Sequence, residues 1–418
     1  MFALADCNNF YVSCERIFNP SLNGVPVIVL SNNDGCVISR SNEAKSLGIK
    51  MGEPLFKVKD KVDRYNIKVF SSNFELYGDI SYRIMERIRD LAPSIEVYSI
   101  DEAFLDLSGI GVDKIETLIK DINYKIRKEI GIPLSIGVSN TKTLSKVAAG
   151  LCKRYPKLKG CCVMHKEDDI KKVLSNCKVS DIWGIGRSYL NHLNMHGIYN
   201  ALQFANSNGN WVKKSMTIVG YKIWQEINGS PQYNIEEDVR DKQEICTSRT
   251  FSKEIVDIEP LSIAISNFAD SCAKKLRDQS SVASCLTVFL LTNRFDSNYS
   301  KTVYTFCFDT PTDSSVQLNK AAQSILRKIY SSDRLYKKAG VVVSKIEKRE
   351  SVVPSLFCDY DINKDHSLMK VIDSMNNKYG RGAIMCASSL NEGVELYSRS
   401  SLSPKYTTCW NDIIKVKI

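Results

Sequence analysis

The sequence predicts a multidomain α+β protein whose chemistry lies in acidic residues at the ends of strands. Residues 1–165 alternate short apolar strands with amphipathic helices, which indicates a mixed α/β core. Residues 166–232 carry only short helical patterns, and residues 245–348 return to long β-rich runs with two helical runs. At 418 residues the chain has room for about three or four domains.

The elements of the first part follow from their patterns. FALADC at 2–7 and VPVIVL at 25–30 are apolar runs of strand length. Residues 74–93 repeat apolar side chains at helical spacing and stop at a proline. Residues 95–108 alternate like a hairpin with acids at its bend. PLSIGVSN at 133–140 predicts a further strand, which a basic helix follows.

A glycine turn distinguishes the helical part. DIWGIGRSYLNHLNMHGI at 181–198 places Gly-Ile-Gly between two short helices, as in a helix-hairpin-helix. Glycines let the backbone approach a phosphate closely, and the following helix offers free N–H groups to it. A polar, acid-rich stretch at 231–244 predicts a linker to an α+β module. Beyond that module, residues 349–418 predict a loosely structured tail with short helices.

Charge and composition limit the classes of function. The formal net charge is +10, and residues 140–160 contain six lysines and arginines without an acid, a distribution that suits a polyphosphate or nucleic-acid partner. A solvated helix face is the alternative. No run reaches the ~20 apolar residues of a membrane span, and no secretory signal is visible. The 14 cysteines are scattered without a CxxC pair, so we expect reduced thiols in a cytoplasmic protein.

Three acids form the candidate catalytic centre. Asp6 ends the first strand, and Asp101 and Glu102 lie at the bend of the hairpin. Carboxylates without histidine or cysteine partners are hard oxygen ligands that suit Mg²⁺ better than zinc. Such a site fits the displacement of pyrophosphate by a hydroxyl group with two metal ions. The alternative is that strand-end acids are ordinary surface residues.

Six motifs in order along the chain carry a resemblance. They are DCNNFYVSCE at 6–15, SNNDGCVISRSNEAKSLGIKMGEP at 31–54, YSIDEAF at 98–104, SNTKTLSKVAA at 139–149, WGIGR at 183–187 and SPKYTT at 403–408. Together they resemble Y-family translesion DNA polymerases and, among these, the UmuC-type catalytic subunits of bacteria. The resemblance implies a right-hand polymerase with palm, fingers, helix-hairpin-helix thumb and little-finger domain.

The resemblance also implies domain bounds. They are 1–22 and 73–165 for the palm, 23–72 for the fingers, 166–232 for the thumb, 233–242 for a linker, 243–348 for the little finger and 349–418 for a partner-binding tail. It further implies an error-prone polymerase that adds dNTPs to a primer 3′-hydroxyl opposite damaged template during SOS mutagenesis. No part of the chain is left over for a proofreading exonuclease.

The resemblance assigns roles at the catalytic centre. Asp6, Asp101 and Glu102 are expected to hold two Mg²⁺ ions, with the carbonyl of Cys7 as a further ligand. One ion lowers the pKa of the primer hydroxyl, and the other neutralises the triphosphate and the leaving pyrophosphate.

Nucleotide contacts are implied in the same way. Ser39, Lys45 and Lys153 fall at the phosphate-contact positions, although some relatives place arginine where Lys45 stands. Lysine keeps the charge and loses the bidentate fork. Asn9 stands where some relatives have tyrosine and is not counted as a phosphate ligand. Tyr11 matches the steric gate, the aromatic ring that occupies the space of a ribose 2′-hydroxyl.

Contacts with bases, duplex and partner proteins complete the expectations. Cys36 and Ile38 are expected to face the nascent base pair, and Lys142, Lys146, Gly184 and Gly186 to hold the duplex backbone without reading sequence. In the tail, Leu356 and Phe357 form a candidate clamp-binding peptide that lacks the usual opening glutamine. The resemblance also implies a processed UmuD dimer and a RecA filament as partners.

Three classes of function compete on the sequence. They are a translesion polymerase, a catalytically inactive DNA-binding accessory, and another palm-type nucleotidyl enzyme such as a cyclase. The three carboxylates argue against the accessory. The thumb motif and Tyr11 argue against the cyclase, which needs neither. The polymerase is therefore the function that the sequence favours.

Overall fold

Five strands from the N-terminal part of the chain form one mixed sheet, the palm sheet. Its order is β5-β6-β1-β7-β8, and the strands are β1 Phe2–Cys7, β5 Ile95–Val97, β6 Glu102–Asp106, β7 Leu134–Ser139 and β8 Cys161–Val163. β1 runs antiparallel to both β6 and β7, while β7 and β8 are parallel. The central strand is thus the one that ends in Asp6 and Cys7.

The computed structural model describes residues 1–237, 240–352, 361–380, 382–389 and 399–415. It divides into two compact units. The first contains Met1–Ser31, Gly35–Val239 and Ser401–Ile418, and the second contains Asn32–Asp34 and Arg240–Ser400. Within the described residues, no helix combines the length and the apolar character required to cross a bilayer.

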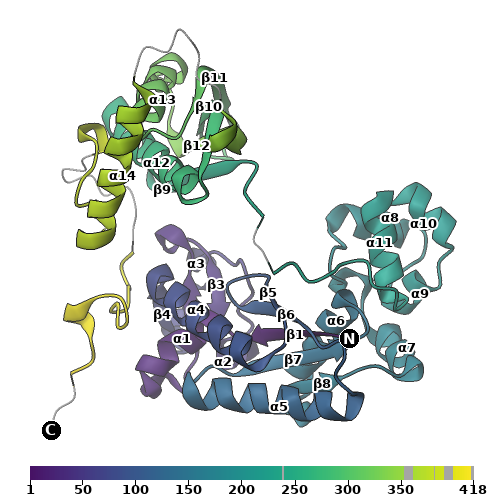
Figure 1. Ribbon diagram of the computed structural model, residues 1–418. Helices are drawn as coiled ribbons and strands as arrows, with labels where there is room; N and C mark the ends of the chain where they lie inside the picture. Colours follow the sequence, from purple (N-terminus) through teal and green to yellow (C-terminus); the bar gives the residue numbers. More distant parts are fainter. Residues whose placement is uncertain (238–239, 353–360, 381, 390–398, 416–418) are drawn as a thin grey trace. The chain divides into compact units, whose positions relative to one another are not determined.

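Helices cover both faces of the palm sheet (Figure 1). α4 Phe74–Leu91 and α5 Val112–Glu129 pack their isoleucine-rich stripes against the face that carries Ala3, Ala5 and Cys7. α6 Lys142–Arg154 lies against the opposite face, where Ala149 packs on Leu4 and Phe104. α1 Phe10–Phe18 follows β1 directly. Because side chains alternate along a strand, Asp6 shares the α6 face with Leu4.

A small three-stranded sheet forms the fingers. Its order is β3-β2-β4, with β2 Val27–Leu30, β3 Val37–Arg40 and β4 Lys68–Ser71. α2 Asn42–Ser46 and α3 Leu55–Arg64 pack on it and close a core of its own. The short 3₁₀ helices among the described residues are η1 Pro20–Leu22, η2 Asn32–Asp34, η3 Pro156–Leu158, η4 Val179–Asp181, η5 Arg349–Ser351, η6 Ala387–Ser389 and η7 Trp410–Asp412.

Five helices make up the thumb. They are α7 Glu167–Asn176, α8 Arg187–Met195, α9 Ala201–Ala205, α10 Gly209–Ser215 and α11 Thr217–Ile227. Gly184 has φ +89°, and an added Cβ there would press on Ile223. Gly186 is the N-cap of α8. The Gly-Ile-Gly turn therefore ends at a helix N-terminus, as the sequence predicted.

The second unit is a four-stranded antiparallel sheet with two helices on one face. Its order is β11-β10-β12-β9, with β9 Ile245–Ile255, β10 Ser281–Leu291, β11 Lys301–Thr312 and β12 Tyr336–Lys348. α12 Ile258–Asp278 and α13 Ser315–Ile329 bury its apolar face. The other face is open, as expected: Cys246 of β9 and Val303 of β11 are exposed on it.

Two expectations from the sequence are wrong in this unit. Cys285 on β10 and Cys307 on β11 are register partners and form a disulfide, so not all cysteines are free thiols. The tail also contains a long helix, α14 Ile362–Tyr379, instead of short helices alone. Its Asp373 accepts two hydrogen bonds from Arg277 of α12 at 2.6 and 2.8 Å, which fixes the helix on the unit.

The close contact between β7 and α6 generates a testable prediction. A Cβ added to Gly137 of β7 would overlap the backbone of Ser145 and Ala149, so the helix must move away from the sheet. We expect Gly137→Ala to lower the free energy of unfolding by about 2–3 kcal/mol, as overpacking usually does. Thermal unfolding followed by circular dichroism measures the change.

Gly150 in the middle of α6 supplies the matched control. A Cβ there meets nothing within 4 Å, so Gly150→Ala is expected to be neutral or to stabilise the helix by up to ~1 kcal/mol. Equal stability of the Gly137→Ala variant and wild type would contradict the packing described here.

Candidate functional site

The candidate site lies where β1 ends and β6 begins. Asp6 and Glu102 are direct partners in the antiparallel register of these strands. The N–H of Cys7 donates to the carbonyl of Asp101 at 2.8 Å, which extends the pairing by one residue. The register therefore places Asp6 beside Glu102, and Asp101 directly precedes Glu102 along the chain. Cys7 itself turns its thiol into the core, so only its backbone borders the site.

Burial controls the charge of Asp6. Its side chain is 9% exposed, and desolvation raises the pKa of the carboxyl to about 7. This pKa already includes two smaller effects: the ammonium of Lys153 lowers it, and the neighbouring Glu102 raises it. Lys153 Nζ lies 2.5 Å from Asp6 Oδ2. A buried carboxylate beside a second carboxylate thus depends on a nearby cation to remain charged.

Glu102 has its own lysine from the same helix. Lys146 Nζ lies 2.8 Å from Glu102 Oε2 and also sits over the ring of Tyr98, 4.9 Å from its centroid. Trp183 holds Tyr98 in turn, because its Nε1 donates to the hydroxyl of Tyr98 at 3.0 Å. α6 therefore presents one ammonium to each of the two paired acids.

Ser99 orients Asp101. Its hydroxyl donates to Asp101 Oδ1 at 2.7 Å and accepts from the N–H groups of Asp101 and Glu102 at 3.3 and 3.1 Å. This closed local turn fixes the backbone from which both acids project. Ser99 is not among the site residues predicted from the sequence, although a serine two residues before an acid is a common signal for a local turn.

The donor set suits a hard divalent cation. It consists of carboxylate oxygens at Asp6, Asp101 and Glu102 with a backbone carbonyl at Cys7, and it contains no imidazole. In the described part of the chain, no three histidine, cysteine or acidic side chains converge into a ready-made ion site. Lys153 and Lys146 neutralise two of the acids instead.

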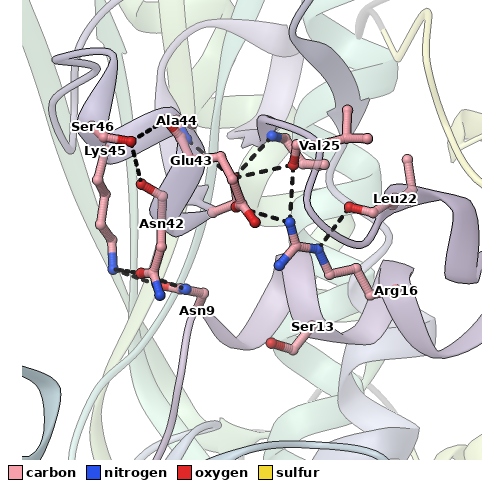
Figure 2. A network of polar contacts seen from close by, with 12 residues as sticks. Asn9, Ser13, Arg16, Leu22, Val25, Asn42, Glu43, Ala44, Lys45 and Ser46 are labelled. Atoms are coloured by element: carbon pink, nitrogen blue, oxygen red, sulfur yellow. Dashed lines mark hydrogen bonds and ion pairs between the residues drawn. The ribbon is translucent and has the colours of Figure 1, made fainter. Parts of the chain in front are cut away.

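Lys45 of the fingers is held by two asparagines (Figure 2). Its ammonium donates to Asn9 Oδ1 at 2.5 Å and to Asn42 Oδ1 at 3.2 Å, and Asn9 Nδ2 also donates to Asn42. Asn9 adopts φ 48° as the N-cap of α1, a conformation that asparagine tolerates. Asn9 thus contributes by positioning Lys45, a role that the sequence did not reveal.

Arg16 ties α2 to α1 in the same network. It donates to Glu43 Oε2 at 2.9 Å and to the carbonyls of Leu22 and Val25 at 3.1 and 2.9 Å, as Figure 2 shows. Two of these contacts, with Val25 and Glu43, reach the fingers. The helix that carries Lys45 is therefore fixed relative to β1 and its acid.

The cations of the fingers and of α6 influence one another. Burial lowers the pKa of Lys45, and the charges of Arg40 and Lys153 lower it further, whereas Asp6 raises it. Arg40 donates to the carbonyl of Ile49, while its buried Nε has no hydrogen-bond partner. Clustered cations and an unused buried donor favour the binding of an anion here.

Ser39 lies on β3 next to Arg40 and is 5% exposed. Its neighbours Cys36 and Ile38 are half-buried: Cys36 N–H donates to Ser31 Oγ at 3.1 Å, and Ile38 packs against the palm core. Because Ile38 and Ser39 are consecutive residues of β3, their side chains point to opposite faces of the strand. The contacts of all three residues with nucleotide or base pair stay predictions.

Tyr11 is bracketed by two aromatic rings of α4. Its ring stacks on Tyr77 with centroids 4.6 Å apart at 17°, and its edge meets Phe74 at 6.0 Å and 84°. Burial raises the pKa of the Tyr11 hydroxyl, and the charge of Asp101 adds to this. The ring thus lies close to the acids and has a fixed orientation.

Of the four duplex-binding candidates, Lys142 differs from expectation. Its side chain is 3% exposed, pairs with Glu96 and donates to the carbonyl of Asn234 at 2.7 Å. A lysine that is buried and paired in this way does not face a DNA phosphate, so we do not retain this assignment. Lys146 is 29% exposed, and Gly184 and Gly186 lie in the thumb turn. The clamp candidates Leu356 and Phe357 lie outside the described residues.

Comparison with solved structures defines the class. The chain matches the Y-family DNA polymerase chimera of Dbh with a TM-score of 0.68 at 21% identity, over 83% of this chain and 100% of the other. The fold is therefore that of Y-family DNA polymerases, a right hand with an additional little finger.

Family models and relatives then give the family. The impB/mucB/samB family model matches residues 5–150, its C-terminal domain matches 242–356, and a domain of unknown function (DUF4113) matches 366–416. Protein UmuC of Salmonella typhimurium is 36% identical over 100% of both chains. DNA polymerase IV of Brucella melitensis is 25% identical over 94% of this chain and 86% of its own length. This chain belongs to the impB/mucB/samB family.

The asparagine bracket of Lys45 leads to a prediction. Asn42→Ala removes one acceptor of the ammonium, and a hydrogen bond to a charged group contributes ~1.5 kcal/mol. We expect binding of a nucleoside triphosphate to weaken about tenfold, because the ammonium loses its fixed position. Titration of dNTP into the protein–primer–template complex measures this affinity.

Ser46 on the same helix is the control, because its hydroxyl donates only to carbonyls of α2 at 2.9 and 3.1 Å. Ser46→Ala should bind the triphosphate as wild type does. An unchanged affinity for dNTP in Asn42→Ala would show that the position of the Lys45 ammonium does not depend on Asn42.

Proposed function

We propose that this protein is an error-prone translesion DNA polymerase of SOS mutagenesis, with Asp6, Asp101 and Glu102 as its catalytic acids. It adds dNTPs to a primer 3′-hydroxyl. The single observation that carries the assignment of the acids is the register of β1 and β6 in a Y-family fold, which sets Asp6 beside Glu102 on the face of α6. A catalytically inactive accessory has no need for a buried acid beside a second acid.

Divalent metal dependence belongs to the family, and two Mg²⁺ ions are our finer proposal. Asp6, Asp101 and Glu102 with the carbonyl of Cys7 would hold them. When bound, such ions lower the pKa of the primer hydroxyl and neutralise charge on the triphosphate. The raised pKa of Asp6 supports this, since burial beside Glu102 calls for positive charge at the site.

The chain's own residues contribute charge and position. Lys153 is 45% exposed, so a triphosphate can compete with Asp6 for its ammonium. Lys45 and Arg40 add two further cations on the fingers side, and Ser39 offers a hydroxyl from β3. Fixed charges in a partly buried site stabilise the developing negative charge of phosphoryl transfer without reorganisation.

Tyr11 supplies selection for deoxyribose in this proposal. Its ring is held between Tyr77 and Phe74, so it cannot turn away easily from an incoming sugar. A rigid ring excludes an extra hydroxyl by steric conflict, which attraction to the correct substrate alone does not achieve. Cys36 and Ile38 would meet the nascent base pair with small side chains that tolerate damaged templates.

The remaining contacts are proposals as well. Lys146, Gly184 and Gly186 would hold the duplex backbone, independent of sequence. From the resemblance we propose that a sliding clamp, a processed UmuD dimer and a RecA filament act with the enzyme. The expected place of action is the nucleoid in the cytoplasm.

The proposal is tested first at Asp101. Asp101→Asn keeps the size and the backbone turn and removes the charge, so primer extension with Mg²⁺ on a gapped template should fall on the order of 10³-fold. Thermal stability should change little. Normal primer extension together with normal thermal stability in Asp101→Asn would show that Asp101 is not a catalytic acid.

Tyr11 provides an independent test. Tyr11→Ala removes the ring that conflicts with a 2′-hydroxyl, so incorporation of rATP relative to dATP should rise by about two orders of magnitude. Single-nucleotide insertion kinetics give both rates. Tyr124 on α5 is an exposed tyrosine, and Tyr124→Ala should leave the ratio as it is in wild type. The same ratio in Tyr11→Ala and wild type would assign the gate to another residue.

A further inference from the structure

The C-terminal segment 401–406 belongs to the first compact unit and is hydrogen-bonded there to residues near the N-terminus of α4. Leu402 forms a parallel bridge with Ser71 at the end of β4. Ser71 N–H donates to the carbonyl of Ser401 at 2.9 Å, and Ser401 N–H donates to Ser71 Oγ at 3.0 Å. The segment thus continues the backbone hydrogen bonding of the fingers sheet, although more than 300 residues separate the partners.

Asn73 connects this segment to α4. Its Nδ2 donates to the carbonyls of Ser403 and Pro404 at 3.1 and 3.2 Å, while its Oδ1 accepts from Leu76 N–H as the N-cap of the helix. Asn73 is 2% exposed, so these bonds are shielded from water. The first turn of α4, which carries Phe74 and Tyr77, therefore starts from a residue that the tail holds in place.

Ser403 also completes a buried acidic network. Its hydroxyl donates to Glu15 Oε1 at 2.9 Å, and the hydroxyl of Tyr77 donates to the same oxygen at 2.6 Å. Glu15, Ser403 and Tyr77 are 2%, 6% and 0% exposed. Burial raises the pKa of Glu15, and the two hydroxyl donors lower it. A buried carboxylate depends on such donors, so each one constrains the others.

Tyr77 connects this buried network to Tyr11 of the candidate active site. Its ring is the one on which Tyr11 stacks, 4.6 Å between centroids. The order of contacts is Ser403, Glu15, Tyr77 and Tyr11, and every step is a direct hydrogen bond or ring contact within one compact unit. Rotation of Tyr77 about its hydroxyl anchor would remove the flat surface that orients Tyr11.

We propose that Ser403 is a positioning residue for sugar selection, which holds the Tyr11 ring in place through Glu15 and Tyr77. This proposal rests on the proposed function, because it concerns how the polymerase rejects ribonucleotides. It gives a role to the end of the segment that matches a domain of unknown function. Tyr406 stacked on Phe18 at 4.6 Å and Lys405 paired with Glu75 at 2.6 Å keep the segment seated.

The test is a comparison of two serine variants in the full-length protein. Ser403→Ala removes the hydroxyl, and we expect the preference for dATP over rATP in single-nucleotide insertion to fall about three- to tenfold. Ser401→Ala is the matched control, since Ser401 engages Ser71 through its backbone. The control should keep the wild-type preference. A merely structural role for Ser403 would lower both insertion rates and leave their ratio unchanged.

A further variant keeps the proposal testable if Ser403→Ala folds poorly. Tyr77→Phe retains the stacking ring and removes the hydroxyl anchor, so it should lower the preference to a similar extent. In the Tyr11→Ala background neither change should reduce the preference further, because both act through the Tyr11 ring. An additional loss there, or wild-type preference in both single variants, overturns the proposal. Absence of dATP insertion by wild type would instead overturn the proposed function.

Discussion

The repulsion between carboxylates buried at the ends of β1 and β6 is the constraint on which the rest of the structure depends. Antiparallel register leaves Asp6 and Glu102 side by side, with Asp6 almost fully buried. Two such charges cannot both persist in a poorly solvated place without nearby cations. Two lysines of one helix, α6, supply these cations: Lys146 pairs with Glu102 and Lys153 with Asp6.

The position of α6 follows from its packing on β7. Gly137 has no side chain, so the helix backbone approaches the strand at Ser145 and Ala149 more closely than another residue allows. At this separation Lys146 and Lys153, two turns apart, reach the two acids on neighbouring strands. On the other side of the site, Arg16 and the asparagines hold Lys45 in the fingers. Rigid supports on both sides leave the cations ready for an anionic substrate.

Much of this arrangement is visible in the sequence, because it depends on local patterns. Strand-end acids, the glycine turn of the thumb and the alternation of helices and strands are short-range signals, and they gave the fold class and the three acids. Lys142 shows the limit of such signals. It belongs to the same basic run as Lys146, but its partner Glu96 lies on the edge strand next to β6, and only the folded chain reveals that it is buried.

Long-range contacts explain the other differences. Asn9 and Asn42 meet around Lys45 from separate helices, and Ser403 reaches Glu15 across almost the whole chain. Cys285 and Cys307 pair only because β10 and β11 are register partners. No local periodicity encodes these pairings, since each depends on which elements become neighbours.

The most direct test of the account is a count of ions at the paired acids. Electron paramagnetic resonance of Mn²⁺ can count the ions bound to the protein with a dideoxy-terminated primer–template and an incoming dNTP, after subtraction of the protein-free mixture. The account predicts two ions in wild type and fewer in Glu102→Gln, whose register partner Asp6 is unchanged. Two ions in both proteins, or none in wild type, would contradict the claim that the β1–β6 acids form the metal site.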